Sequence, residues 1–114
     1  MRMEVLNTDE AFVLIRLDGR LDLKGVEEIQ LSFTVNASRS EKPVLVDLGS
    51  VTFVGSLAIG MLFASARNLH LRGSRMTLFG ATPHIEEVLR TASVNLVAGL
   101  VATEGEARQA ATGA

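Results

Sequence analysis

The segment 44–60, VLVDLGSVTFVGSLAIG, constrains the fold of this chain most, because a buried-strand pattern there leads into a helix start. Residues 44–48 are apolar apart from Asp47, as in a central strand that is covered on both faces. We expect a tight loop next and then Ser56 at the mouth of a helix. A helix N-terminus offers unpaired N–H groups and a positive dipole end, which suit a phosphate. Ser56 is therefore the leading candidate for a functional residue.

Two strands are predicted near the N-terminus. Residues 11–18, AFVLIRLD, alternate loosely between apolar and polar, and Gly19 is expected to end this strand. Residues 4–6 form a shorter candidate, joined to the first by the polar turn 7–10. The two segments are expected to pair as an antiparallel hairpin.

Two helices are expected on either side of the central strand. Asp22 is well placed as the N-cap of the first, whose apolar residues follow a helical period. The polar run 38–43 ends that helix. The second is expected over residues 56–72, with Gly73 just beyond its C-terminus.

The C-terminal third of the chain continues the alternation of strands and helices. Residues 75–79 read as a strand, and Thr82 and Pro83 then open a helix through Arg90, since Thr is a good N-cap and Pro suits the first helical position. Residues 95–102 are ambiguous between a short strand and a turn.

This alternation predicts an α/β fold, a small mixed β-sheet flanked by helices. A length of 114 residues suits a single domain. We expect that domain to span residues 1–102. Residues 103–114 are Ala-rich and polar with little to bury, so they should form a short C-terminal helix or a flexible tail.

The order of these motifs resembles the STAS domain family, the anti-sigma factor antagonists. The usual signature of that family is a hydrophobic strand ending Asp-Leu-Ser, then Val-x-Phe, then Asp-Ser-(Ser/Thr/Ala)-Gly-Leu-Gly. The matching positions here are Asp47, Val51, Phe53, Ser56, Ile59 and Gly60. Upstream, residues 19–22, GRLD, resemble the Gly-Glu-Leu-Asp of the family. The resemblance runs from about Glu4 to about Val101 and implies a STAS-like fold.

The resemblance also implies a function. It makes Ser56 the phospho-acceptor of a regulatory module that binds an anti-sigma factor or related serine kinase and lets go when phosphorylated. It further implies that the kinase uses ATP, that a phosphatase resets the switch, and that Asp22 lies across a shallow groove from the phospho-acceptor and contributes to nucleotide or partner contact. From the residues alone, the default interpretation is that Ser56 and Asp22 serve only as helix N-caps.

Two departures from the family signature leave a second hypothesis open. Gly55 replaces the acidic residue that normally precedes the phospho-acceptor, and Leu57 replaces a small, often hydroxylated residue. The glycine is expected to allow unusual backbone angles at the loop-to-helix junction. The alternative function is a constitutive STAS subunit of a stress-sensing scaffold or of a lipid-transport ABC complex, without a phosphorylation switch.

The second expected helix carries a candidate partner-binding strip. With Leu62 at the centre of the buried face, a rotation of about 100° per residue places four residues on the same side, namely Ala58, Ser65, Ala66 and Leu69. The residues that point away are Leu57, Gly60, Met61 and Ala64. Beside Ser56 and Gly55 they would form a flat patch suited to a partner helix or strand, unless another helix of the domain covers them.

Composition argues against several other classes of protein. The chain has no Cys, and its two His, His70 and His84, are isolated, so no metal site is expected. A net charge of −2 and aromatic residues that are all Phe argue against nucleic-acid binding. The absence of a signal-peptide core or a spanning apolar run predicts a cytoplasmic protein with no membrane insertion. With no phosphate-binding loop or nucleophile elbow, neither a cofactor nor enzymatic activity is expected.

Overall fold

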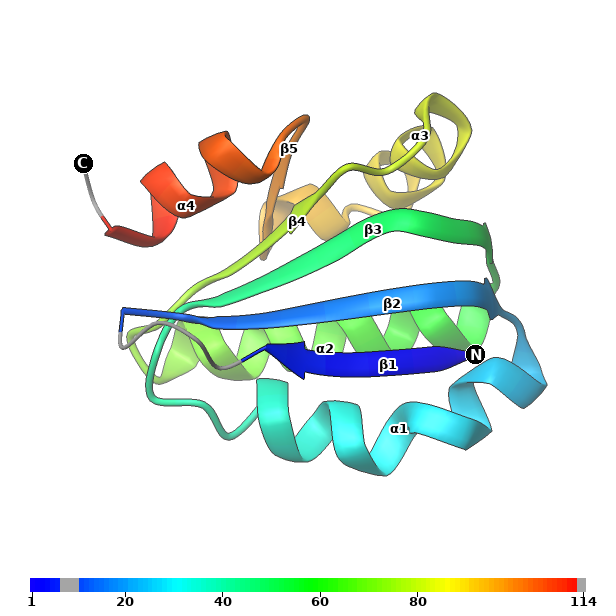
Figure 1. Ribbon diagram of the computed structural model, residues 1–114, viewed down its shortest axis with the longest axis horizontal. Coiled ribbons are helices and arrows are strands. Elements are labelled where there is room, and N and C mark those ends of the chain that lie inside the picture. Colours follow the sequence, from blue (N-terminus) through cyan, green and yellow to red (C-terminus); the bar gives the residue numbers. More distant parts are fainter. Residues whose placement is uncertain (7–10, 113–114) are drawn as a thin grey trace.

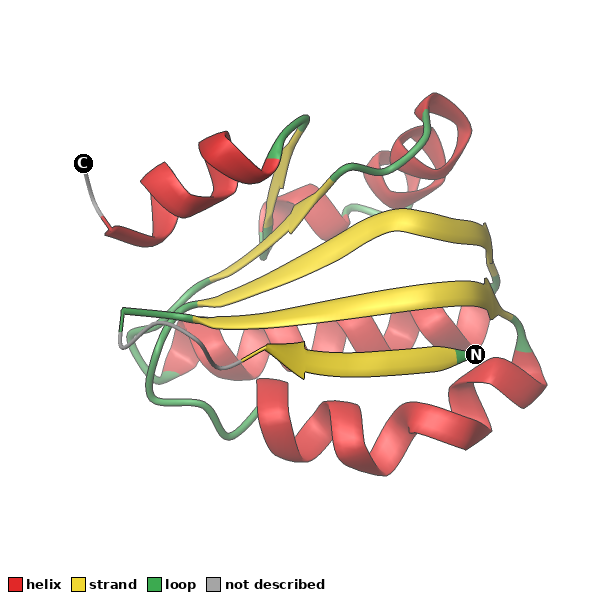
Figure 2. Ribbon diagram, in the orientation of Figure 1, coloured by secondary structure: helices red, strands yellow, loops and turns green. Residues whose placement is uncertain are grey.

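The computed structural model describes residues 1–6 and 11–112, so the predicted turn at 7–10 lies outside the described residues. Within them the chain forms a mixed five-stranded sheet in the order β1-β2-β3-β4-β5 (Figures 1 and 2). Strand β1 is antiparallel to β2, which confirms the predicted hairpin pairing, and the other neighbours are parallel. The strands are β1 (Arg2–Leu6), β2 (Val13–Leu21), β3 (Val44–Val54), β4 (Met76–Phe79) and β5 (Gly99–Val101).

Helices cover both faces of this sheet, which confirms the predicted fold class. Helices α1 and α2 lie beside each other on one face, and α4 lies on the other (Figure 1). The helical elements are α1 (Leu23–Ala37), α2 (Ser56–Leu71), α3 (Pro83–Thr91), the short 3₁₀ helix η1 (Val94–Leu96) and α4 (Glu104–Thr112). The ambiguous segment 95–102 thus contains the end of η1 and all of β5.

The first residues of β3 alternate between two apolar cores, as expected of a strand segment covered on both faces. Val44 and Val46 are fully buried in the larger core, beneath α1, α2 and α3. Leu45 is fully buried on the opposite face, where Ala107 of α4 packs against it. The other buried members of this smaller core are Phe12, Leu14 and Phe79.

Strands β2 and β3 are longer than their sequences predict. Gly19 does not end β2, because its φ of 116° is accommodated in an irregularity of the pairing and the strand continues to Leu21. Strand β3 likewise continues past Leu48 to Val54, since this stretch pairs with the extended end of β2. The predicted tight loop is therefore wrong, and Gly55 alone separates β3 from α2.

The predicted N-caps Asp22 and Thr82 are confirmed. The Asp22 carboxylate accepts the backbone N–H of Gly25 at 2.9 Å, and the Thr82 hydroxyl accepts that of Ile85 at 3.4 Å. Gly25 itself lies against β2, because a Cβ there would come within 2.0 Å of the Arg20 carbonyl oxygen. The start of α1 is thus held closely against the end of β2.

The contrast between two helical glycines gives a stability prediction. Gly25→Ala should destabilise the fold by about 3 kcal/mol, because backbone must move to admit the methyl group. Gly60→Ala should stabilise it by about 0.5–1 kcal/mol, since among the described residues no atom outside its chain neighbours and its own helix backbone lies within 4 Å of the added Cβ. Urea denaturation of both variants measures the difference. A Gly25→Ala variant as stable as the unmodified chain would contradict the described junction.

Candidate functional site

The candidate site lies at the edge of the sheet where β2 and β3 end and α1 and α2 begin. Because β2 and β3 are parallel, the two strand-to-helix junctions meet at this edge. The backbone N–H of Gly55 donates to the carbonyl oxygen of Leu21 at 3.0 Å and ties the junctions together. Asp22 and Ser56, the residues that follow these two, are therefore brought to the same edge.

Ser56 is the exposed first residue of α2. Gly55 occupies the N-cap position and has no side chain to cap with, so the alternative in which Ser56 is only an N-cap is wrong. Within residues 1–6 and 11–112, the Ser56 hydroxyl has no hydrogen-bond partner, and the first turn of α2 holds no acidic residue. A hydroxyl that is exposed and unpartnered is accessible to a modifying enzyme.

Gly55 is not required by its backbone angles, which corrects the sequence-based interpretation. Its φ of −99° and ψ of 179° are extended values that any residue adopts. What a side chain would meet is the ring of Phe53, whose Cε2 lies 3.2 Å from the position of a Cβ on Gly55. The glycine thus leaves room for the ring beside the start of α2.

Arg20 completes this edge, although sequence reasoning did not single it out. Its guanidinium carbon lies 4.5 Å from the centroid of the Phe53 ring, and the two residues are register partners on β2 and β3. Its Nε also lies 3.4 Å from Oδ2 of Asp22. The sequence does place a cation, Arg20, and an aromatic residue, Phe53, near the ends of two strands. Only the parallel pairing of these strands shows that the two side chains meet.

Asp22 and Asp47 do not converge, so they form no carboxylate pair. Asp22 is held by the backbone N–H of Gly25, which lowers the pKa of its carboxyl below the ordinary value, and Arg20 lowers this pKa further. Asp47 lies within β3 rather than at its carboxyl end, with Oδ2 3.1 Å from Nε of Arg16. Its Oδ1 accepts the backbone N–H of Gly49 at 2.8 Å, so this carboxylate serves local backbone structure.

A groove of about 340 Å³ runs between α1 and α2, with Ser56 in its lining. The α1 side contributes Gln30, Thr34 and Ser38, none of which the sequence analysis singled out. The α2 side contributes Ser56, Leu57, Gly60, Met61, Ala64, Ser65 and Asn68. The predicted strip is thus one wall of a groove rather than a flat patch.

The helical wheel is right for most of α2 and wrong for Met61. The residues predicted to face inward are all buried, and Leu57, Gly60 and Ala64 are exposed, with Leu57 at 56%. Met61 is only 7% exposed and packs in the larger core. Met61 stands on the flank of α2 beside Ser65, whose hydroxyl bonds Ser38 at the end of α1, and α1 packs against α2 there, so the alternative in which another helix covers the strip holds for Met61. Met61 therefore forms the floor of the groove and not its outer lip.

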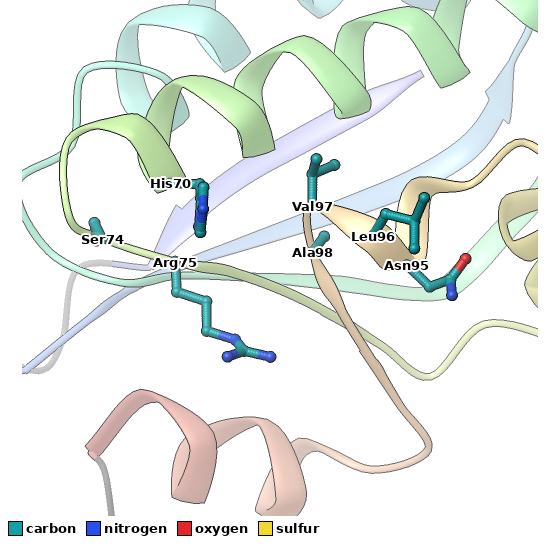
Figure 3. A pocket seen from close by; sticks show the side chains of 7 residues that line it. All are labelled: His70, Ser74, Arg75, Asn95, Leu96, Val97 and Ala98. Atoms are coloured by element: carbon teal, nitrogen blue, oxygen red, sulfur yellow. The ribbon is translucent and has the colours of Figure 1, made fainter.

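A second cavity, of about 180 Å³, lies near the C-terminal end of α2 and does not form a comparable site. In Figure 3 the side chain of Arg75 extends away from His70, so the two do not converge on one point. Among the described residues, no group of three or more His, Cys, Asp and Glu side chains could hold a metal ion. Within residues 1–6 and 11–112, no helix has the length and apolar character needed to cross a membrane.

Comparison with known proteins identifies the family. The family model described as "Mlab, STAS domain" matches residues 5–103. The chain belongs to the STAS domain family. No curated protein matches its sequence.

Solved structures share the fold of this STAS domain over nearly its whole length. An anti-sigma factor antagonist from Mycobacterium paratuberculosis superposes with a TM-score of 0.85 at 16% identity, covering 97% of this chain and 93% of that one. An anti-sigma-factor antagonist (STAS) domain protein from Planctomyces limnophilus gives 0.81 at 25% identity, with 96% and 97% covered. The Bacillus cell fate determinant SpoIIAA in its phosphorylated form gives 0.72 at 22% identity, with 95% and 97% covered.

The lowered pKa of Asp22 predicts how its contribution to stability depends on pH. A carboxyl whose pKa is lower in the folded state than in the unfolded state stabilises the fold at pH values above its ordinary pKa of 3.8. This contribution is lost as the pH falls through the folded-state pKa. Asp22→Ala should therefore be less stable than the unmodified chain at neutral pH, and the difference should shrink in acid. Urea denaturation at neutral pH and at about pH 2.5 measures this. Asp22→Asn keeps an acceptor without a charge and is the control, and an unchanged Asp22→Ala difference at both pH values would contradict the assignment.

Proposed function

We propose that this STAS domain is a phosphorylation-controlled interaction module that binds an anti-sigma factor or related serine kinase through the groove between α1 and α2. Phosphorylation of Ser56 then releases the partner. The observation that carries the proposal is the exposed hydroxyl of Ser56 in the lining of that groove, which has no partner among the described residues. The kinase would transfer the γ-phosphoryl group of ATP to Oγ of Ser56, and ADP and the hydroxyl proton would leave.

The surroundings of Ser56 suit a partner that must be released by charge. Leu57 next to it is a large exposed apolar side chain. Gly60 and Ala64 are small residues of the same wall, so the backbone of a partner can come close to α2 there. A partner that covers this wall must exclude water from Ser56. Phosphorylation adds nearly two negative charges, and a charge buried without a partner is costly. The same contact is thus favourable with serine and unfavourable with phosphoserine.

The similarity to known antagonists supports the proposal at the level of the family. Anti-sigma factor antagonists are among the chains with the same fold, and SpoIIAA has been solved in a phosphorylated form. A constitutive STAS subunit, as in a lipid-transport complex or a stress-sensing scaffold, is the second candidate. Gly55 favours it, because the acidic residue of the usual signature is missing.

An acidic mimic separates the two candidates. Ser56→Asp should weaken binding to the serine kinase encoded nearest this chain's gene, by about tenfold, because the carboxylate must be desolvated. The melting temperature should hold or rise slightly, since an acid in the first turn complements the helix dipole. Calorimetric titration and a thermal melt measure both quantities. A carboxylate has one charge where phosphate has nearly two, so release should be partial.

Charge placed elsewhere in the groove tests the surface itself. Ala64→Glu should also weaken binding about tenfold with little change in stability, because Ala64 is exposed on α2. Ala110→Glu makes the same substitution at an exposed position of α4, on the other face of the sheet, and should bind normally. Weak binding by Ala64→Glu with full binding by Ser56→Asp would favour the constitutive subunit. Full binding by both variants would contradict the proposal that the partner binds through the groove.

A further inference from the structure

Strand β1 forms one edge of the sheet, and its outer side has no partner among the described residues. The sheet order places β2 on one side of β1 and no described strand on the other (Figure 1). Within residues 1–6 and 11–112, the backbone groups of β1 bond only to β2. An edge strand with open N–H and C=O groups is a template on which a further strand can pair.

Apolar side chains are exposed beside this edge. Val5 of β1 is one of them, at 36% exposure. On α1, Glu28 faces the start of β1, because its carboxylate lies 3.1 Å from the N-terminal amine. Leu31 and Val35, three and seven residues further along α1, lie on the same side of the helix as Glu28 and are exposed at 79% and 47%. The strand and the helix next to it thus leave apolar surface uncovered along one edge of the molecule.

The charged side chains of β1 alternate in sign and form no ion pair among the described residues. Arg2 and Glu4 are both exposed and lie on the same face of the strand. Arg16 stands opposite Glu4 on β2, but it pairs with Asp47 of β3 at 3.1 Å. Arg2 stands opposite Asp18 without an ion pair. Charges on an edge usually discourage strand addition, yet a strand that carries one charge of each sign can pair with a copy of itself.

We propose that two copies of this chain associate through their β1 strands, in antiparallel pairing centred on Met3. This register sets Arg2 of each copy opposite Glu4 of the other, and the exposed Val5 opposite Met1. A slip by one residue would set charged side chains against apolar ones. A slip by two residues would set Glu4 against Glu4 in one direction and Arg2 against Arg2 in the other. Charge and pleat therefore select the same register.

The pairing joins the two sheets into one and extends a row of charges that each copy already contains. On one face of the joined sheet, Asp47, Arg16 and Glu4 of one copy are followed by Arg2 and Asp18 of the second copy, so the sign alternates throughout. Antiparallel neighbours in a sheet are related by a two-fold axis perpendicular to it, so both copies place α1 on the same side. The exposed apolar residues of α1 then face the second α1.

The β1 surface is separate from the groove. Gln30, Thr34 and Ser38 line the groove from the flank of α1 that is turned toward α2, whereas Glu28 lies on the flank beside β1. Two copies joined through β1 therefore present two open grooves, each with its own Ser56. A partner that itself has two binding surfaces can engage both grooves at once and gain avidity.

Charge reversal tests the pairing in the full chain. In sedimentation equilibrium, the unmodified chain should form a dimer that dissociates on dilution. Glu4→Arg sets like charges opposite Arg2, and Arg2→Glu sets like charges opposite Glu4, so each variant alone should associate at least about tenfold more weakly. Mixed in equal amounts, the two variants should form a heterodimer with nearly the unmodified affinity, because each arginine then faces a glutamate again.

The control is Glu87→Arg, which makes the same reversal at an exposed position of α3, where the helix packs against β3 and η1. It should associate like the unmodified chain. An unmodified chain that stays monomeric up to about 1 mM would overturn the proposal, and so would a mixture that associates no better than its two components. Neither result bears on phosphorylation of Ser56, because no kinase or partner takes part in the measurement.

Discussion

The parallel pairing of β2 with β3 is the constraint on which the rest of this structure depends. The irregular pairing around Gly19 lets both strands run on together, so that they end at one edge of the sheet. The hydrogen bond from the N–H of Gly55 to the carbonyl of Leu21 then fixes the starts of α1 and α2 relative to each other. The groove between these helices, and the position of Ser56 in it, follow from that pairing.

The site is built from contacts that are individually modest and share one edge. Asp22 caps α1, Arg20 lies over Phe53, and the small size of Gly55 leaves space for that ring. None of these contacts uses the Ser56 hydroxyl. A modification at that hydroxyl can therefore change the surface seen by a partner without breaking an interaction that the fold needs. This separation of stability from recognition is what a reversible switch requires.

Much of the fold could be predicted from the sequence, because local signals agree with it. The apolar run at residues 44–48, the caps Asp22 and Thr82, and the helical spacing of α2 all predict elements that the structure contains. Element lengths could not be predicted as well, since the extension of β3 to Val54 depends on pairing with a strand about 30 residues away in sequence.

The candidate site was only partly accessible to sequence reasoning. At about 100° per residue Met61 stands on the flank of α2, and a wheel of one helix does not show that α1 packs beside that flank and covers Met61. The α1 wall of the groove and the stacking of Arg20 on Phe53 are tertiary contacts without a local signature. The interpretation of Gly55 failed for a related reason, because the space beside it is set by a neighbouring ring and not by its own backbone.

The central claim is that Ser56 carries a reversible phosphate, and intact-mass analysis of the protein purified from its native host tests it most directly. The account predicts two species that differ by one phosphate group, with the heavier one removed by phosphatase treatment and absent when Ser56 is replaced by Ala. A single unmodified mass under every growth condition in which the partner is present, or a phosphate located at Ser40, Ser50 or Thr52 and not at Ser56, would contradict it.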